Sequence, residues 1–290
     1  MLKEVKTVKR VLILYHSGAG STKTIAEIYR EKLKDLSPGL MPLTLPFPYE
    51  ILGHYDLIIL GFPTYHGEAP HSMVQFVENM PSFEPQKAAF LFTTYGLYPA
   101  NSLYHLGKKL KEKNYALSFT AGYRAPATDA ALLLPPMNPL FRYGKKTSKK
   151  LKTHLNHIRK CIVSSQVVEV NPRFRFHALL NYPNQYFGKR VKHQFMVNDT
   201  LCVQCNRCVH ECILKCWHRG SSSLVPVYDN THCEYCFKCV HHCPSNAIML
   251  SSKTKERPKL NQAFYQKRKE ALLSCLNHEE CFAKKNQRRN

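Results

Sequence analysis

The sequence predicts a doubly wound α/β domain followed by a small cysteine-rich domain. Continuous apolar stretches lie within 11–15, 56–61 and 88–94, as expected of parallel strands that are covered on both faces. Between them, apolar residues recur at helical spacing over 21–33 and 71–80. This alternation of strand and helix favours a parallel sheet with helices on both faces.

Further elements extend this pattern. A weaker strand is expected at 40–46 and a fifth strand at 116–123, after a helix near 101–113. The Pro-broken apolar stretch LLLPPMNPLF is predicted to be a loop, and a basic helix is predicted from Lys149 onward. Apolar residues follow one face of this helix, which we expect to cover the sheet: Leu151, Leu155, Ile158 and Ile162.

The chain is strongly cationic, with 42 Lys and Arg against 20 Asp and Glu and a formal charge of +22. Such a surface attracts acidic proteins, nucleic acid or anionic lipids, and charge alone does not choose among them. The longest apolar stretch, from Ala130 to Leu134, is far too short to span a bilayer. The N-terminus lacks the long apolar region of a secretory signal, so we expect a cytoplasmic protein without a membrane span.

Two cysteine runs of identical spacing dominate the second half of the chain. Residues 198–212 and 229–243 align at an offset of 31 residues, and each contains a C-x2-C-x2-C-x3-C run. This is the cysteine spacing of bacterial ferredoxins, and residues 195–250, including the closing CPSNAI, resemble their two-cluster module. A zinc site is the alternative, although zinc commonly uses two separated C-x2-C pairs.

The resemblance implies two [4Fe–4S] clusters, and the fourth cysteine of each run would serve the other cluster. One cluster would be held by Cys202, Cys205, Cys208 and Cys243, and the other by Cys233, Cys236, Cys239 and Cys212. The first run departs from the ferredoxin pattern, because Ile213 and Cys216 stand where the second run has Pro244 and Ala247. We interpret Cys216 as a small buried neighbour of a cluster and not as a ligand.

A loop rich in glycine and hydroxyl groups follows the first predicted strand. In HSGAGST, at 16–22, two glycines let backbone N–H groups approach a phosphate, and the following helix N-terminus favours negative charge. The loop has neither the P-loop spacing nor the G-x-G-x-x-G fingerprint. Two further loops, at 61–70 and 93–102, also follow predicted strands, at the edge where doubly wound sheets bind ligands.

With these loops, residues 10–165 resemble flavodoxin. The resemblance implies bound FMN, with its phosphate on the first loop and its ring between the other two. The implied cofactor-binding residues are Ser17, Gly18, Ala19, Gly20, Ser21, Thr22, Pro63, Thr64, Tyr65, His66, Gly67, Thr94, Tyr95 and Gly96. Tyr65, Tyr95 and Tyr98 are candidates to stack on the ring, with ordinary loop packing as the alternative. His66 and His71 are candidate proton donors, with plain surface histidines as the alternative.

The whole chain resembles the flavodoxin–ferredoxin fusion proteins of anaerobic microbes. We expect a flavodoxin-like domain over 1–168, a connection over 169–199, a ferredoxin-like α+β domain over 200–252 and a basic, helix-prone tail over 253–290. The connection is expected to pack through its own apolar side chains: Phe174, Phe176, Leu179, Leu180, Tyr186 and Phe187.

The resemblance implies an electron-transfer flavoprotein. Its clusters would exchange electrons with FMN, and the partner would be an acidic redox protein or a small-molecule acceptor. The sequence marks no catalytic triad or carboxylate pair. One alternative is a reductase whose organic substrate lies over the flavin, against the apolar segment 131–141. A nucleic-acid-binding protein is a further alternative prompted by the charge, although we expect no specific nucleic-acid recognition.

Overall fold

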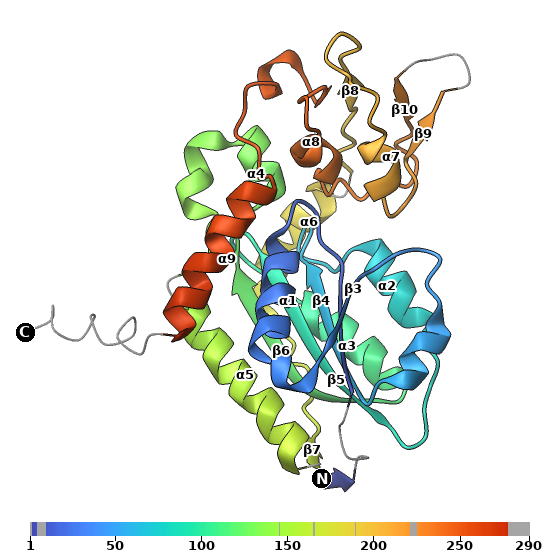
Figure 1. The fold of residues 1–290 in the computed structure, drawn as a ribbon, viewed down its shortest axis with the longest axis vertical. Coiled ribbons are helices and arrows are strands. Elements are labelled where there is room, and N and C mark those ends of the chain that lie inside the picture. Colours follow the sequence, from blue (N-terminus) through green and yellow to red (C-terminus); the bar gives the residue numbers. More distant parts are fainter. Residues whose placement is uncertain are drawn as a thin grey trace, which may run out of the picture.

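The computed structural model describes residues 2–4, 10–144, 146–164, 166–188, 190–220 and 225–277. Its largest part is a five-stranded parallel sheet in the order β3-β2-β4-β5-β6 (Figure 1). The strands are β2 (Val11–Tyr15), β3 (Gly39–Pro42), β4 (Leu57–Pro63), β5 (Lys87–Tyr95) and β6 (Tyr115–Arg124). All five predicted strands are therefore present, and the chain reverses its winding direction between β2 and β4.

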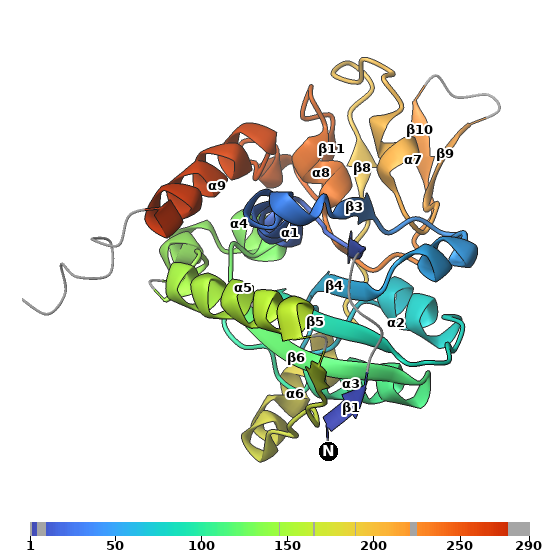
Figure 2. The same cartoon turned by 60° about the horizontal axis from the view of Figure 1, so that its bottom comes forward.

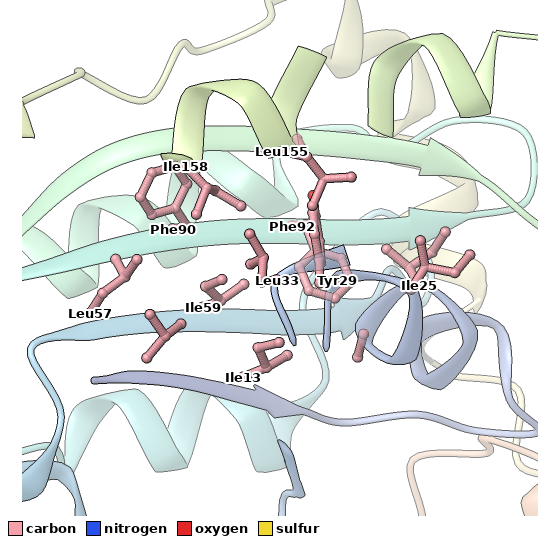
Figure 3. Packing of buried hydrophobic residues seen from close by; sticks show 14 of the residues in the cluster. Ile13, Ile25, Tyr29, Leu33, Leu57, Ile59, Phe90, Phe92, Leu155 and Ile158 are labelled. Atoms are coloured by element: carbon pink, nitrogen blue, oxygen red, sulfur yellow. The ribbon is translucent and has the colours of Figure 1, made fainter. Parts of the chain in front are cut away.

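Helices cover both faces of this sheet. One face carries α1 (Ser21–Lys32) and α5 (Thr147–Ser164), and the other carries α2 (His71–Glu78) and α3 (Ser102–Glu112). On the first face, Ile59 and Phe92 of the sheet lie in one core cluster with Tyr29 of α1 and Ile158 of α5 (Figure 3). The basic helix predicted from Lys149 therefore covers the sheet as expected.

Short elements connect these parts. β1 (Leu2–Glu4) pairs with β7 (Gln166–Val168), and the turns η1 (Lys34–Leu36) and η2 (Tyr49–His54) flank β3. After β6 the chain forms α4 (Thr128–Leu133) and η3 (Pro135–Leu140), where the sequence predicted a loop. That prediction was wrong because prolines are tolerated in the first turn of a helix, and Pro135 and Pro136 open η3.

The cysteine repeat forms a small unit at one end of the sheet (Figure 1). It contains α7 (Arg207–Glu211), α8 (Lys238–His242), and two antiparallel pairs: β8 (Met196–Val197) with β11 (Ile248–Met249), and β9 (Trp217–Arg219) with β10 (Pro226–Tyr228). Left-handed backbone conformations recur at the offset of the sequence repeat: Gln204 and Tyr235, Asn206 and Phe237, Lys215 and Asn246. The sequence repeat is therefore also a repeat of backbone shape.

The segment after the cysteine repeat returns to the sheet. Beyond η5 (Ser252–Thr254), α9 (Gln262–Asn277) lies beside α1 and α5 (Figures 1 and 2). Its helix was predicted, but its packing was not. Leu272, Leu273 and Leu276 join the core cluster on that face, so the first part of the expected tail covers apolar surface. The rest, 278–290, lies outside the described residues.

The connection between the two units packs only in part as the sequence predicted: the Phe174 ring lies 5.3 Å from that of Phe176, and the Tyr186 ring lies 5.4 Å from that of Phe187. It contains η4 (Phe176–Asn181) and α6 (Tyr182–Gly188), and all six apolar side chains expected to pack are exposed. The reason is that the segment is held through its backbone, where Arg175 N donates to Asn101 Oδ1 over 2.8 Å. Of its described apolar side chains, Ala178 and Phe195 are buried, and Phe195 packs within the cysteine unit.

A buried polar chain crosses the core between α1, β6 and α5. The Tyr29 and Tyr123 hydroxyls share a hydrogen bond of 2.6 Å, and the Tyr123 hydroxyl also bonds Nδ1 of His154. Burial lowers the pKa of the His154 imidazole to about 4. An imidazole binds a proton more readily in the unfolded chain, where its pKa is about 6.5.

We predict that His154 weakens the fold in acid. The pKa of His154 is lower in the folded chain than in the unfolded chain. Its contribution to the free energy of unfolding is therefore complete above about pH 6.5 and is lost as pH falls towards about 4. Over this window the wild type should lose up to about 3 kcal/mol relative to His154→Gln, measured by urea unfolding at several pH values. His105→Gln, at an exposed position, is the control and should follow the wild type. Parallel curves for wild type and His154→Gln would contradict this account.

Candidate cofactor site

Three loops meet at the carboxyl edge of the sheet. They follow β2, β4 and β5 and contain the residues 17–22, 63–67 and 94–96 that the sequence assigned to FMN. The Thr22 and Thr94 hydroxyls lie 2.8 Å apart, and Thr64 N donates to Thr94 O over 2.8 Å. The structure therefore brings these three segments together where the winding reverses, which is where such sheets bind ligands.

The first of them, called here the phosphate loop (17–22), has free backbone donors. Among the described residues, no acceptor pairs with the backbone N–H groups of this loop. Its hydroxyls are engaged, since Ser21 Oγ donates to Pro126 O over 2.8 Å and Thr22 pairs with Thr94. The amides at the start of α1 can hold an anion, while the hydroxyls hold the loop in place.

Tyr65 lies against the phosphate loop. A Cβ placed on Gly18 would lie 2.9 Å from the Tyr65 hydroxyl. That hydroxyl is buried and has no hydrogen-bond partner among the described residues. Buried polar groups are normally paired, so a hydroxyl that faces open amides fits a site that receives a polar ligand.

The other two tyrosines considered for stacking are engaged elsewhere. The Tyr95 ring lies over β6, where a Cβ on Gly122 would be 3.1 Å from it. The Tyr98 ring packs against His177 at a centroid distance of 5.5 Å. Both rings therefore have packing partners within the protein, and Tyr65 is the one of the three shown beside the phosphate loop.

Helix α6 lies against the second loop. A Cβ on Gly67 would lie 2.4 Å from Nε2 of Gln185, and a Cβ on Gly188 would lie 2.2 Å from Nδ1 of His66. Gly67 has φ +84, a conformation that favours glycine. His66 and His71, the two candidate proton donors, are both exposed.

The cysteine repeat surrounds a cavity of about 480 Å³. All nine cysteines of the repeat line it, together with residues 16–20 of the first sheet loop. Its apolar wall includes Phe195, Trp217, Phe237 and Ile248. Within the described ranges, no three His, Cys, Asp or Glu side chains form a group that could hold a single metal ion. A cubane binds its thiolates at separate iron atoms, so its ligands do not converge on one point as those of zinc do.

Backbone amides point at the fourth thiol of each run. Cys216 N donates to Cys212 Sγ over 3.3 Å, and Ala247 N donates to Cys243 Sγ over 3.2 Å. The two bonds occupy equivalent positions in the repeat. Hydrogen bonds of this kind tune the potential of iron–sulfur clusters.

Cys216 is buried, as interpreted from the sequence. Its thiol donates to the carbonyl oxygen of Leu214 over 3.8 Å and lies close to the thiols of Cys212 and Cys233. The interaction between these thiols raises the pKa of Cys216 and lowers that of Cys212. Cys216 therefore remains a protonated thiol beside two other cysteines.

The second cysteine loop (233–239) sits on the phosphate loop. A Cβ on Gly18 would lie 2.7 Å from the carbonyl oxygen of Cys236. Nearby, His242 Nε2 donates to Ala19 O over 2.8 Å, and its Nδ1 lies 2.7 Å from Glu211 Oε2. Burial raises the pKa of Glu211, but hydrogen bonds from His242 and Arg207 outweigh this and hold it at about 2.

A buried carboxyl–imidazole pair adjoins this contact. Glu234 Oε2 lies 3.9 Å from His16 Nε2, and the side chains are 7% and 5% exposed. Burial raises the pKa of Glu234 to about 7 and lowers that of His16 to about 3. Both groups are therefore uncharged in mildly acidic solution. Ser72 N donates to Glu234 Oε1 over 3.3 Å.

Comparison with known proteins identifies the first part of the chain. The strand order and the ligand loops define a flavodoxin-like fold, and the model of the flavodoxin domain family matches residues 12–126. The N-terminal part is therefore a flavodoxin-like domain, as predicted. No curated protein matches the sequence, and the ferredoxin-like nature of the cysteine repeat stays a prediction.

Solved structures show similarity of limited extent. A flavodoxin from the domain Archaea shares 15% identity over 54% of this chain and 98% of its own, with a TM-score of 0.39. Two-electron reduced flavodoxin of Megasphaera elsdenii shares 22% identity over 39% of this chain and 84% of its own, with a TM-score of 0.34. Rubredoxin oxygen:oxidoreductase from Desulfovibrio gigas shares 17% identity over 55% of this chain and 37% of its own, with a TM-score of 0.41.

Three residues at the site were not foreseen from the sequence. Tyr265 of α9 places its hydroxyl 3.0 Å from Ser21 Oγ, and its ring lies over Gly20. Glu234 and His242 lie inside the second cysteine run, where the spacing drew attention to the thiols alone. The sequence contains one signal that could have pointed to Glu234, which is the only acidic residue between Cys233 and Cys243.

We predict that Gly18→Ala loosens the contact between the two units. The new Cβ would lie 2.7 Å from the Cys236 carbonyl, which is backbone and cannot rotate away. The expected cost is about 1–3 kcal/mol in urea unfolding, with faster proteolysis in the connection. Gly53→Ala is the matched control, because nothing lies within 4 Å of its added Cβ. Equal losses in both variants would show that the tight fit at Gly18 is not the cause.

Proposed function

We propose that this protein is an electron-transfer flavoprotein that holds FMN and two [4Fe–4S] clusters in one chain. The observation that carries the proposal is the direct contact of the second cysteine loop with the phosphate loop, at Cys236 and Gly18. When bound, the clusters pass single electrons and FMN accepts one or two. The proposal includes the division of the chain into a flavodoxin-like domain that ends at 168, a connection that ends at 199, a ferredoxin-like domain that ends at 252 and the tail.

The residues present fit the phosphate of FMN. The open amides of 17–22 would hold it, and the unpaired Tyr65 hydroxyl would donate to it. Ser21 and Thr22, assigned to the cofactor from the sequence, would act instead by fixing the loop. The second and third loops, at 63–67 and 94–96, would flank the flavin ring.

The residues also fit two clusters in a defined order. Cys233, Cys236, Cys239 and Cys212 would hold an inner cluster beside the phosphate loop. Cys202, Cys205, Cys208 and Cys243 would hold an outer cluster. Among these cysteines Cys205 is exposed, so the outer cluster is the side from which an external partner would exchange electrons.

A second candidate is a reductase of an organic substrate. It is supported by the exposed side chains of Leu133, Leu134, Met137 and Leu140. This segment reaches the third loop, where a Cβ on Gly96 would lie 3.0 Å from Phe141. Anaerobic reduction followed by a screen of organic acceptors distinguishes the two functions, because only a reductase turns an organic acceptor over.

The cofactor content tests the proposal. Anaerobically purified protein should contain about eight irons and eight sulfides, and denaturation should release FMN. Zinc in place of iron would end the cluster assignment. If the protein holds both clusters but neither contains nor binds FMN, the assignment of FMN is wrong.

Cys205→Ala and Cys216→Ala form a matched pair. Cys205→Ala should lose one cluster and about half of the iron, because it removes a proposed ligand. Cys216→Ala should keep both clusters, because its thiol donates to the Leu214 carbonyl and the equivalent position of the second run, Ala247, is already alanine. Iron analysis with electron paramagnetic resonance measures both, and a loss of half the iron in Cys216→Ala would overturn the ligand assignment.

We also propose an acidic redox protein as the external partner. The formal charge of +22 should speed its approach. The rate of reduction by a small acidic ferredoxin should therefore fall as salt rises, since salt screens exposed charges. Stopped-flow measurement of the reduction rate over a range of ionic strength tests this. A rate that does not change with salt would rule out steering by charge.

A further inference from the structure

Exposed apolar side chains are concentrated in a few segments of the chain. Most of the large apolar side chains that are exposed in the described residues lie at Leu97, in 133–140 and in 174–191. The most prominent are Leu180, Phe176 and Phe187, which are 85%, 78% and 65% exposed. Monomeric proteins rarely expose apolar side chains in such density unless they bind something.

The segments 133–140 and 174–191 each reach the third loop and, with Leu97 of that loop, are called here the apolar rim. Leu97 lies between Gly96, which touches Phe141, and Tyr98, whose ring is 5.5 Å from that of His177. The segment 133–140 is tied to the sheet by Arg124, whose Nη2 donates to Leu140 O over 2.5 Å. The rim therefore borders the third loop of the flavodoxin-like site from both sides.

Positive charge accompanies the rim. Between 169 and 198 the sequence has five Lys or Arg and a single acidic residue, Glu169, which pairs with Lys111 over 3.0 Å. Arg173, Arg190 and Lys192 are exposed among the apolar side chains. The Arg190 guanidinium lies 3.3 Å from the centre of the Tyr186 ring, which joins cationic and aromatic groups on one face.

The nearest acidic groups do not reverse this charge. Asp129 precedes the rim, and its Oδ1 accepts a hydrogen bond from Ala130 N over 2.8 Å at the start of α4. Glu68 follows the second loop and has partners of its own. Neither lies within the rim segments.

We propose that the apolar rim docks this protein on an anionic lipid surface. Phe, Tyr and Leu side chains enter the boundary between headgroups and acyl chains, while Arg and Lys meet the lipid phosphates. Side chains that project from short helices need no matching pocket in a fluid surface, whereas a protein partner must supply one. No helix in the described ranges is long and apolar enough to cross a membrane, so the docking is peripheral. The inference does not depend on the proposed cofactors.

The test is co-sedimentation of the full chain with vesicles of phosphatidylcholine and phosphatidylglycerol, and with vesicles of phosphatidylcholine alone. The wild type should bind the anionic vesicles and bind the neutral ones far more weakly. The double variant Phe176→Ser/Leu180→Ser should bind at least about tenfold more weakly, because two inserted side chains are lost. Arg190→Gln should weaken binding about fivefold through the loss of one surface cation.

The matched control is Val168→Ser/Val227→Ser, which changes two exposed apolar residues outside the rim and should bind as the wild type does. Urea unfolding of all variants checks that the fold is kept. Absence of binding to anionic vesicles, equal binding to neutral vesicles, or unchanged binding by the double rim variant would each overturn the proposal. Sedimentation velocity tests the alternative that a second copy of this chain binds the rim. A wild-type dimer that dissociates only in the rim variants, together with no vesicle binding, would show that the rim joins two copies instead.

Discussion

The close approach of the Cys236 carbonyl to Gly18 organises this molecule. The phosphate loop must be bare at that point, because any side chain would collide with backbone at 2.7 Å. The bare backbone at Gly18 therefore lets the cysteine unit lie directly against the phosphate loop. A cofactor in the phosphate loop would then share one buried region with the cysteine cavity, whose wall already includes residues 16–20.

The surroundings of this contact come from distant parts of the chain. His242 and Glu211 join the cysteine unit to Ala19, and Tyr265 of α9 closes the loop at Ser21 and Gly20. Buried charges are costly unless they are paired, and Glu211 meets this condition through His242, Arg207 and Lys238. The neutral pair of Glu234 and His16 avoids the same cost in mildly acidic solution by carrying no charge. The contact is thus polar, with Glu211 paired and with the Tyr65 hydroxyl, His16 Nε2 and Glu234 Oε2 left without hydrogen-bond partners among the described residues.

Elements that a local sequence pattern encodes could be predicted. Packing that depends on which surface the other elements leave uncovered could not. Strands such as β2 and β4 are continuously apolar because both faces of the sheet are covered, and that pattern is visible in the sequence. The cysteine repeat was visible for the same reason, and its backbone follows the same offset. By contrast, Phe176 and Leu180 are apolar yet exposed, while Leu272 and Leu276 of the basic tail are packed. Which apolar residues find a partner depends on the surface left open by the other elements, and no local pattern encodes it.

Cys216 shows how one substitution separates two otherwise equivalent halves. Its backbone N–H and that of Ala247 make the same bond to the fourth thiol of their runs. The methyl group of Ala247 adds nothing further, whereas the thiol of Cys216 also faces Cys212 and Cys233. Both of these belong to the proposed inner cluster, and hydrogen bonds to ligand sulfurs are one of the means by which proteins set cluster potentials. The repeat therefore keeps one backbone while placing beside the site next to the phosphate loop a thiol that the outer site lacks, and two sites that differ in this way need not exchange electrons on equal terms.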